Sequence, residues 1–166
     1  MEDEQTEVWQ LLRLLDDPDH LEFPADFDYD RANDRASDLC HRLECDFGCS
    51  LYLLTGPGVQ DATFRADIAI PPEATATGKQ IWLRISNHGP LAIYGIGTIR
   101  ASNRDADAGA ELHPDDRARL ESALIEHGYI IVPNDPLHEP YDGLNDKWRG
   151  RMNPPFTWFV RYFDYT

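Results

Sequence analysis

Lysine is almost absent from this chain of 166 residues, and long apolar runs are missing altogether. The only lysines are Lys79 and Lys147, and 15 basic residues stand against 30 acidic ones, which gives a net charge of −15. A surface of that sign repels the phosphates of nucleic acids and the headgroups of anionic lipids. The composition therefore argues against nucleic-acid binding and against membrane attachment, and it favours a basic partner.

The chain also lacks the features of an exported or membrane-spanning protein. No segment approaches the roughly 18 apolar residues that a membrane helix needs. Its first four residues include three acids, whereas a signal peptide begins with basic residues. Cysteine occurs three times, an odd number that favours reduced thiols over a disulfide framework. We therefore expect a soluble, cytoplasmic protein.

Enough apolar residues remain for a core, because 42% of the chain is hydrophobic and 11% is aromatic. A chain of this length suits one domain that buries roughly 70% of its unfolded surface. We expect a single domain over residues 1–166. Its predicted parts are an acidic helical part (1–47), an antiparallel meander (48–100), and a third part with a helix, a strand, a long loop and a final aromatic strand (101–166).

Helical periodicity is clear in three places. Within 2–15, leucines and a valine recur at the spacing of an amphipathic helix. The same spacing recurs within 32–43, where aspartates and arginines take the outer positions. A third helix is predicted to begin at Pro114, which is followed by two acids, and to end near Gly128.

Alternating or continuous apolar segments predict strands at 49–55, 64–70, 81–85 and 91–99, with a short one at 129–133. Residues 156–165 carry aromatics at both odd and even positions, which predicts a strand buried on both faces. The predicted fold class is α+β. It comprises a mainly antiparallel sheet of about five to six strands, with two N-terminal helices and one later helix packed against it.

No cofactor motif is present, and two possible metal sites fail on spacing. Asp26, Asp28, Asp30 and Asp34 alternate like calcium ligands, but arginine takes the position that needs glycine and Ser37 the position that needs glutamate. A cluster of three cysteines and His41 lacks the closely paired spacing of structural zinc sites. Gly95 and Gly97 lack the third glycine of a dinucleotide-binding loop, which favours close packing within a strand. We therefore predict no metal and no cofactor.

The negative charge is regional, because the first fifty residues carry 15 acids against four arginines. We interpret the acidic, aromatic-containing segment from Asp16 to Asp38 as the docking surface for a basic partner protein, as in an immunity-type inhibitor that covers a cationic cleft. Carboxylates would steer the encounter and aromatics would anchor it. The predicted partner-binding residues are Asp16, Asp17, Asp19, Glu22, Phe23, Asp26, Phe27, Asp28, Tyr29 and Asp30.

Two alternatives stay open. One is an enzyme whose acid–base groups come together only in the folded chain, with the candidate residues His88, Asp135, His138, Glu139 and Asp142. The other is a salt-adapted soluble protein, which would carry acids all over its surface, although residues 51–100 contain only three. A continuous exposed acidic patch would favour the docking hypothesis, whereas a pocket that gathers the histidines and carboxylates would favour an enzyme.

Overall fold

A computed structural model describes residues 2–21, 23–55, 66–86, 88, 90–98, 112–146, 149 and 155–163. Its class is α+β, as the sequence predicts. None of the helices in this part of the chain is long and apolar enough to cross a membrane. The elements, in chain order, are α1 (Glu2–Leu15), α2 (Tyr29–Phe47), β1 (Tyr52–Leu54), β2 (Ala66–Ile70), the short 3-10 helix η2 (Pro72–Ala74), β3 (Ile81–Ile85), β4 (Leu91–Ile96), α3 (Pro114–Glu126), β5 (Ile130–Ile131), α4 (Asn134–Leu137) and α5 (Trp158–Phe163).

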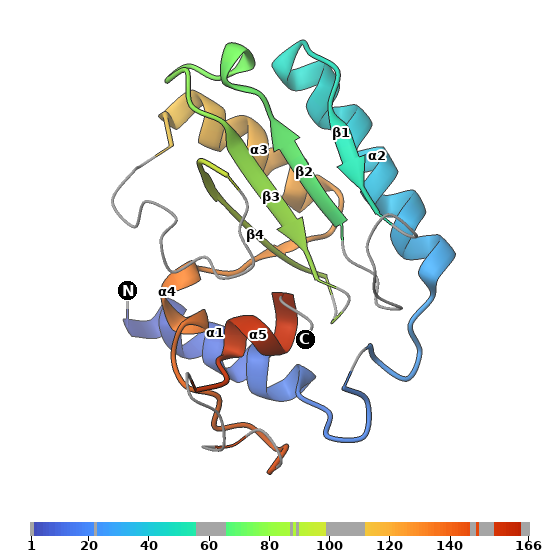
Figure 1. Ribbon diagram of the computed structural model, residues 1–166, viewed down its shortest axis with the longest axis vertical. Helices are drawn as coiled ribbons and strands as arrows, with labels where there is room; N and C mark the ends of the chain where they lie inside the picture. Colours follow the sequence, from blue (N-terminus) through green and yellow to red (C-terminus); the bar gives the residue numbers. More distant parts are fainter. Residues whose placement is uncertain are drawn as a thin grey trace.

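The five strands form one sheet in the order β1-β2-β3-β4-β5 (Figure 1). Neighbours from β1 to β4 are antiparallel, so the predicted meander is confirmed, and β5 adds to β4 in parallel. The register sets Trp82 opposite Gly95, and a Cβ on Gly95 would lie 2.6 Å from the indole ring. This glycine therefore serves close packing rather than phosphate binding, as the sequence analysis favours.

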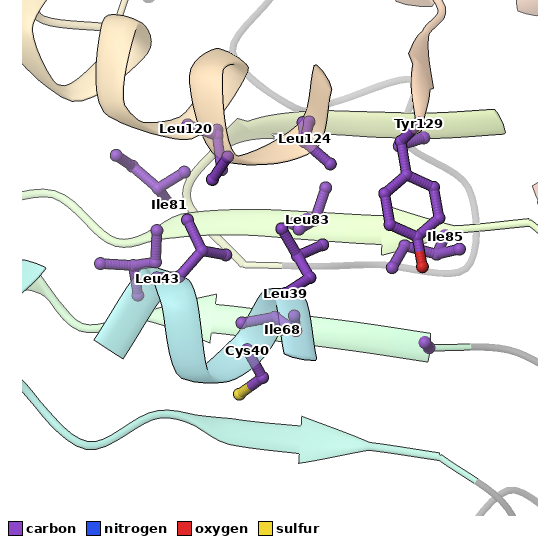
Figure 2. Packing of buried hydrophobic residues seen from close by; sticks show 14 of the residues in the cluster. Leu39, Cys40, Leu43, Ile68, Ile81, Leu83, Ile85, Leu120, Leu124 and Tyr129 are labelled. Atoms are coloured by element: carbon purple, nitrogen blue, oxygen red, sulfur yellow. The ribbon is translucent and has the colours of Figure 1, made fainter. Parts of the chain in front are cut away.

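One face of the sheet packs against α2 and α3. Alternate residues of β3 point to that face, and Figure 2 shows Leu83 between leucines of the two helices. Each buried side chain of this size contributes about 1.5–3 kcal/mol through the hydrophobic effect. The main members of this core are Leu39, Cys40, Leu43, Ile68, Ile81, Leu83, Ile85, Leu120, Leu124 and Tyr129.

The opposite face packs against α1, α4 and α5, which come from the two ends of the chain and gather below the strands in Figure 1. Strands β3 and β4 contribute Trp82, Leu91 and Ile93, the residues that alternate with those of the first core. Helix α5 contributes four buried aromatic side chains, those of Trp158, Phe159, Tyr162 and Phe163.

The prediction of a final aromatic strand at 156–165 is wrong, because Trp158–Phe163 is a helix. A spacing of four residues places side chains on one face of a strand, since four is even, and also on one face of a helix. Trp158 with Tyr162 and Phe159 with Phe163 are such pairs, so the periodicity alone allowed both structures. The predicted number of helices was also too low, because α4 and α5 are additional.

The sheet holds the end of α5 through hydrogen bonds to carbonyl groups that the helix itself cannot use. Ser86 donates its hydroxyl to the carbonyl of Tyr162 (2.6 Å), and Arg84 donates to that of Phe163 (3.1 Å). Arg84 also binds Asp67 through two bonds of 2.8 and 3.1 Å, and both side chains are buried. These contacts place α5 so that Arg161 faces the acidic segment that follows α1.

Candidate functional site

Asp16 does not lie on the surface, although it stands among the predicted partner-binding residues. Its side chain is 1% exposed and forms an ion pair of 2.9 Å with Nε of Arg161. The second carboxylate oxygen accepts hydrogen bonds from the hydroxyl of Tyr141 (2.8 Å) and the backbone N–H of Leu144 (2.7 Å). Asp16 therefore stabilises the fold and cannot steer a partner.

Arg161 binds the segment after α1 from the other side. Its guanidinium donates to the backbone carbonyls of Asp17, His20 and Leu21, at 3.2, 3.4 and 3.0 Å. A buried guanidinium needs such partners, because taking a charge out of water is costly without them. The segment is thereby attached to the protein, which fixes the position from which the remaining acids act.

The next predicted residues form a turn at the protein surface. Oδ1 of Asp17 accepts the backbone N–H of Asp19 (2.9 Å), and Oδ2 lies 2.8 Å from Nδ1 of His20. The hydrogen bond from Asp19, with that from His20, lowers the pKa of Asp17 below its ordinary value. Asp19 is exposed, and Glu22 lies outside the described residues.

The exposed part of the segment combines acids with aromatic side chains. Phe23 and Tyr29 are 39% and 40% exposed, and the rings of Phe23 and Phe27 lie 5.7 Å apart. Asp26, Asp28 and Asp30 are also exposed. Asp28 is the N-cap of α2, where its side chain accepts the N–H of Arg31 (3.0 Å), so that one of the predicted docking acids also begins the helix.

The acidic surface continues along α2 beyond the predicted list. Asp30, Asp34 and Asp38 are exposed and follow one another at intervals of four residues, so they form a row on one helix face. None of the three forms an ion pair with a described residue. The predicted docking segment runs to Asp38 and places Asp34 and Asp38 on the outer face of this helix, but the individual binding residues predicted from the sequence end at Asp30. The four-residue interval was the signal for including them.

The arginines of α2 form no ion pair with this row among the described residues. Arg42 binds Asp46 (2.8 Å) and Glu126 of α3 instead, and the hydrogen bond to Glu126 raises the pKa of Arg42 and lowers that of Glu126. Arg31 and Arg35 line a cavity of about 330 Å³ beside the helix, together with Tyr129.

The alternative catalytic set is only partly brought together. Asp135, Glu139 and Asp142 line a hollow of about 380 Å³ with Trp9 and Arg13. Arg13 binds Asp142 through two hydrogen bonds of 2.8 and 3.0 Å, which lower the pKa of Asp142. This arrangement keeps that carboxylate ionised, whereas a general acid at neutral pH needs a raised pKa.

The two histidines of that set do not line the hollow. His138 stacks on Phe159, with ring centroids 5.7 Å apart. His88 is 1% exposed, and its Nε2 lies 3.0 Å from the guanidinium of Arg161. The same Nε2 lies 3.2 Å from the backbone carbonyl oxygen of Leu21, which also accepts a hydrogen bond from Arg161. His88 thus belongs to the buried network of Arg161.

The cysteines and the alternating aspartates form no metal site within the part of the chain that the structure describes. Cys40 is buried in the core, whereas Cys45 is exposed. Burial, with the nearby carboxylate of Glu44, raises the pKa of the thiols of Cys40 and Cys49. A thiol with a raised pKa is a poor nucleophile at neutral pH.

The candidate surface is therefore an exposed acidic face, defined here as Asp26, Asp30, Asp34 and Asp38 together with the aromatic residues Phe23 and Tyr29. We compared the chain with protein-family models, with curated proteins and with solved structures, and none of them matches it.

Proposed function

We propose that this protein is a small acidic binding protein that docks a basic partner protein through the acidic face. The observation that carries the proposal is the row of Asp30, Asp34 and Asp38 on α2, which are exposed and form no ion pair with a described residue. Like charges four residues apart on a helix are destabilising by about 0.2–0.5 kcal/mol per pair. A partner that supplies the opposite charge would relieve this repulsion.

The aromatic residues of the acidic face support the same proposal. Phe23 and Tyr29 are about 40% exposed and flank the start of α2. Aromatic side chains surrounded by polar groups often contribute most of the binding energy of a protein interface. The expected division of roles is that the aspartates accelerate association and the aromatics slow dissociation.

The distribution of arginines adds a kinetic argument. Because Arg42 binds other carboxylates, and because Arg31 and Arg35 form no ion pair with the row among the described residues, the exposed aspartates present their charge to the solvent. Such fields raise association rates by about 10–10³-fold for an oppositely charged partner, and salt weakens them. This is the behaviour expected of an immunity-type inhibitor that must find a cationic cleft quickly.

Two triple variants with the same net charge test the proposal. The first is Asp30→Lys, Asp34→Lys and Asp38→Lys, and the matched control is Glu73→Lys, Asp115→Lys and Asp146→Lys, which changes exposed acids on other elements. Immobilised wild-type protein and both variants are compared for the proteins they retain from a lysate of the source cells. A basic protein retained by wild type and control but not by the first variant is expected.

Association of that protein is then measured by stopped flow at several salt concentrations. The rate constant should fall steeply with salt for the wild type and stay nearly flat for the first variant. Tyr29→Ala should mainly increase the dissociation rate. Equal retention by the two triple variants, or retention of no basic protein by the wild type, would contradict the proposal.

A further inference from the structure

A cavity of about 330 Å³ lies beside the first two turns of α2. Part of its wall is apolar and is formed by Phe27, Ala32, Ile85 and Pro90. This volume is within the range of about 300–1,000 Å³ that is typical of small-molecule sites. The cavity is therefore large enough for a ligand the size of an amino acid.

Two arginines give the cavity a basic end. Arg31 and Arg35 lie one helical turn apart, and neither forms an ion pair with any described residue. Arg84 and Arg161, by contrast, each form an ion pair with a buried carboxylate. In a chain of net charge −15, two arginines that line one cavity and form no ion pair with a described residue indicate a place for an anionic group.

Tyr129 supplies a second, independent indication at the same end. Its side chain is 95% buried, since only 5% is exposed, and its hydroxyl forms no hydrogen bond with a described residue. The ring lies beside Ile85 in Figure 2, and the guanidinium of Arg35 is 5.2 Å from its centroid. Burial raises the pKa of Tyr129 to about 12, so its hydroxyl is a hydrogen-bond donor at neutral pH. Because Tyr129 lines the cavity, its hydroxyl can donate a hydrogen bond to an oxygen of a bound ligand.

The other end of the cavity is acidic. Asp26 and Asp28 line it just before α2, and only Oδ1 of Asp28 is used by the N-cap hydrogen bond. From Asp28 to Arg35 the helix rises by about 10 Å, at 1.5 Å per residue. Arg31 lies next to Asp28, whose side chain accepts its backbone N–H, whereas Arg35 lies one turn further along the helix, beyond Ala32.

We propose that this cavity is a binding site for a lysine-like ligand, a carboxylate and an amine cation joined by an aliphatic chain. The carboxylate binds Arg31, Arg35 and the hydroxyl of Tyr129. The aliphatic chain lies along Ala32 and Phe27, and the cation reaches Asp26 and Asp28. The ligand is either a free amino acid or the C-terminal residue of a peptide, since both carry this chemistry.

Four probes separate these requirements when they are titrated at millimolar concentrations into the isolated, isotope-labelled protein and followed by NMR. Lysine and Nα-acetyl-lysine carry both charged ends, norleucine lacks the side-chain amine, and 1,5-diaminopentane lacks the carboxylate. Saturable shifts of the Ala32 and Gly128 amides are expected with the first two probes. Tighter binding of lysine indicates the free amino acid, whereas tighter binding of Nα-acetyl-lysine indicates a peptide terminus.

Variants then test the two ends of the site. Arg35→Gln should weaken binding roughly tenfold, because it removes a charge-assisted hydrogen bond, and Tyr129→Phe should weaken it roughly threefold. Asp26→Asn should weaken lysine binding without affecting norleucine. Matched controls are Arg117→Gln, which changes an exposed arginine outside the cavity, and Tyr52→Phe, which changes a tyrosine that is 73% exposed. Both should leave binding unchanged.

The proposal is overturned if neither lysine nor Nα-acetyl-lysine gives saturable shifts. It is also overturned if norleucine or 1,5-diaminopentane binds as tightly as lysine, or if the cavity variants bind as the wild type does. Because the titration uses the isolated protein, its failure leaves the docking of a basic partner through the aspartate row unaffected.

Discussion

The two sides of this protein use the same charged residue types in opposite ways. Around α5, Asp16 and Arg161 are buried, paired and surrounded by further hydrogen bonds. Along α2, Asp30, Asp34 and Asp38 are exposed and form no ion pair with a described residue. Buried charges need partners in the fold, whereas exposed charges can remain without any. The comparison separates carboxylates that stabilise the fold from carboxylates that are free to act on another molecule.

The largest effect is expected from breaking the buried side with Arg161→Met. The carboxylate of Asp16 would then be buried without its counter-charge, which costs about 3–5 kcal/mol. Urea unfolding should show this loss of stability. Adding Asp16→Asn should restore part of it, and Arg117→Met on the exposed face of α3 should change stability by less than about 0.5 kcal/mol. A loss of less than about 1 kcal/mol for Arg161→Met would mean that water reaches the pair.

Gly143→Ala tests the same network without removing a charge. A Cβ at this position would collide with the carboxylate of Asp16 and the ring of Tyr141. Relief of the overlap requires these groups to shift, and a cost of about 1–3 kcal/mol is expected. Thermal unfolding measures it. Unchanged stability would show that the loop around Gly143 adjusts independently of Asp16.

The exposed side should respond in the opposite direction. Asp34→Lys replaces two repulsive pairs, with Asp30 and Asp38, by two attractive ones, and it replaces the attractive pair with Arg31 by a repulsive one. The isolated protein should therefore gain about 0.4–1 kcal/mol of stability. Glu73→Lys, outside α2, provides the control and should have little effect. A loss of stability in Asp34→Lys would contradict this prediction, because it would show that Asp34 makes a net stabilising interaction in the wild-type protein.

The smallest effect is expected at the ion pair of Asp142 with Arg13. Its side chains are 60% and 50% exposed, so they are neither buried like those of Asp16 and Arg161 nor, like the aspartate row, without an ion pair to a described residue. Arg13 lowers the pKa of Asp142 in the folded protein, so the pair contributes above the ordinary pKa of 3.8 and loses its contribution as falling pH protonates Asp142. Asp142→Asn should cost about 0.5 kcal/mol at pH 7 after allowance for solvent screening. Urea unfolding at pH 7 and at pH 2 would show whether the difference disappears in acid; a constant difference would assign it to packing.

The sequence predicted most of the fold because much of it follows from local patterns. The spacing of apolar residues located α1, α2 and α3, and alternation located the strands of the meander. It failed at α5, where intervals of four fit a strand and a helix equally well. Contact with the sheet favours the helix at this place, because Arg84 and Ser86 donate hydrogen bonds to the carbonyl groups at its end.

The candidate site was predicted in part. Charge counting located the acidic region, but it treated Asp16 like its neighbours, because nothing local to Asp16 indicates that Arg161, 145 residues later, lies against it. The candidate residues of the enzyme alternative also could not be grouped from the sequence, because their grouping depends on contacts between distant segments. The structure gathers its three carboxylates around one hollow and leaves its two histidines outside.

By itself, the sequence determined the α+β class, the antiparallel meander and the concentration of negative charge in the first fifty residues. These depend on composition and on periods of two and 3.6 residues, which are properties of neighbouring positions. Only the tertiary structure decided which carboxylates are buried and which are exposed, and only it placed Tyr129 beside Arg35. The physical reason is that burial and ion pairing depend on contacts between segments distant in the chain, and local periodicity carries no information about such contacts.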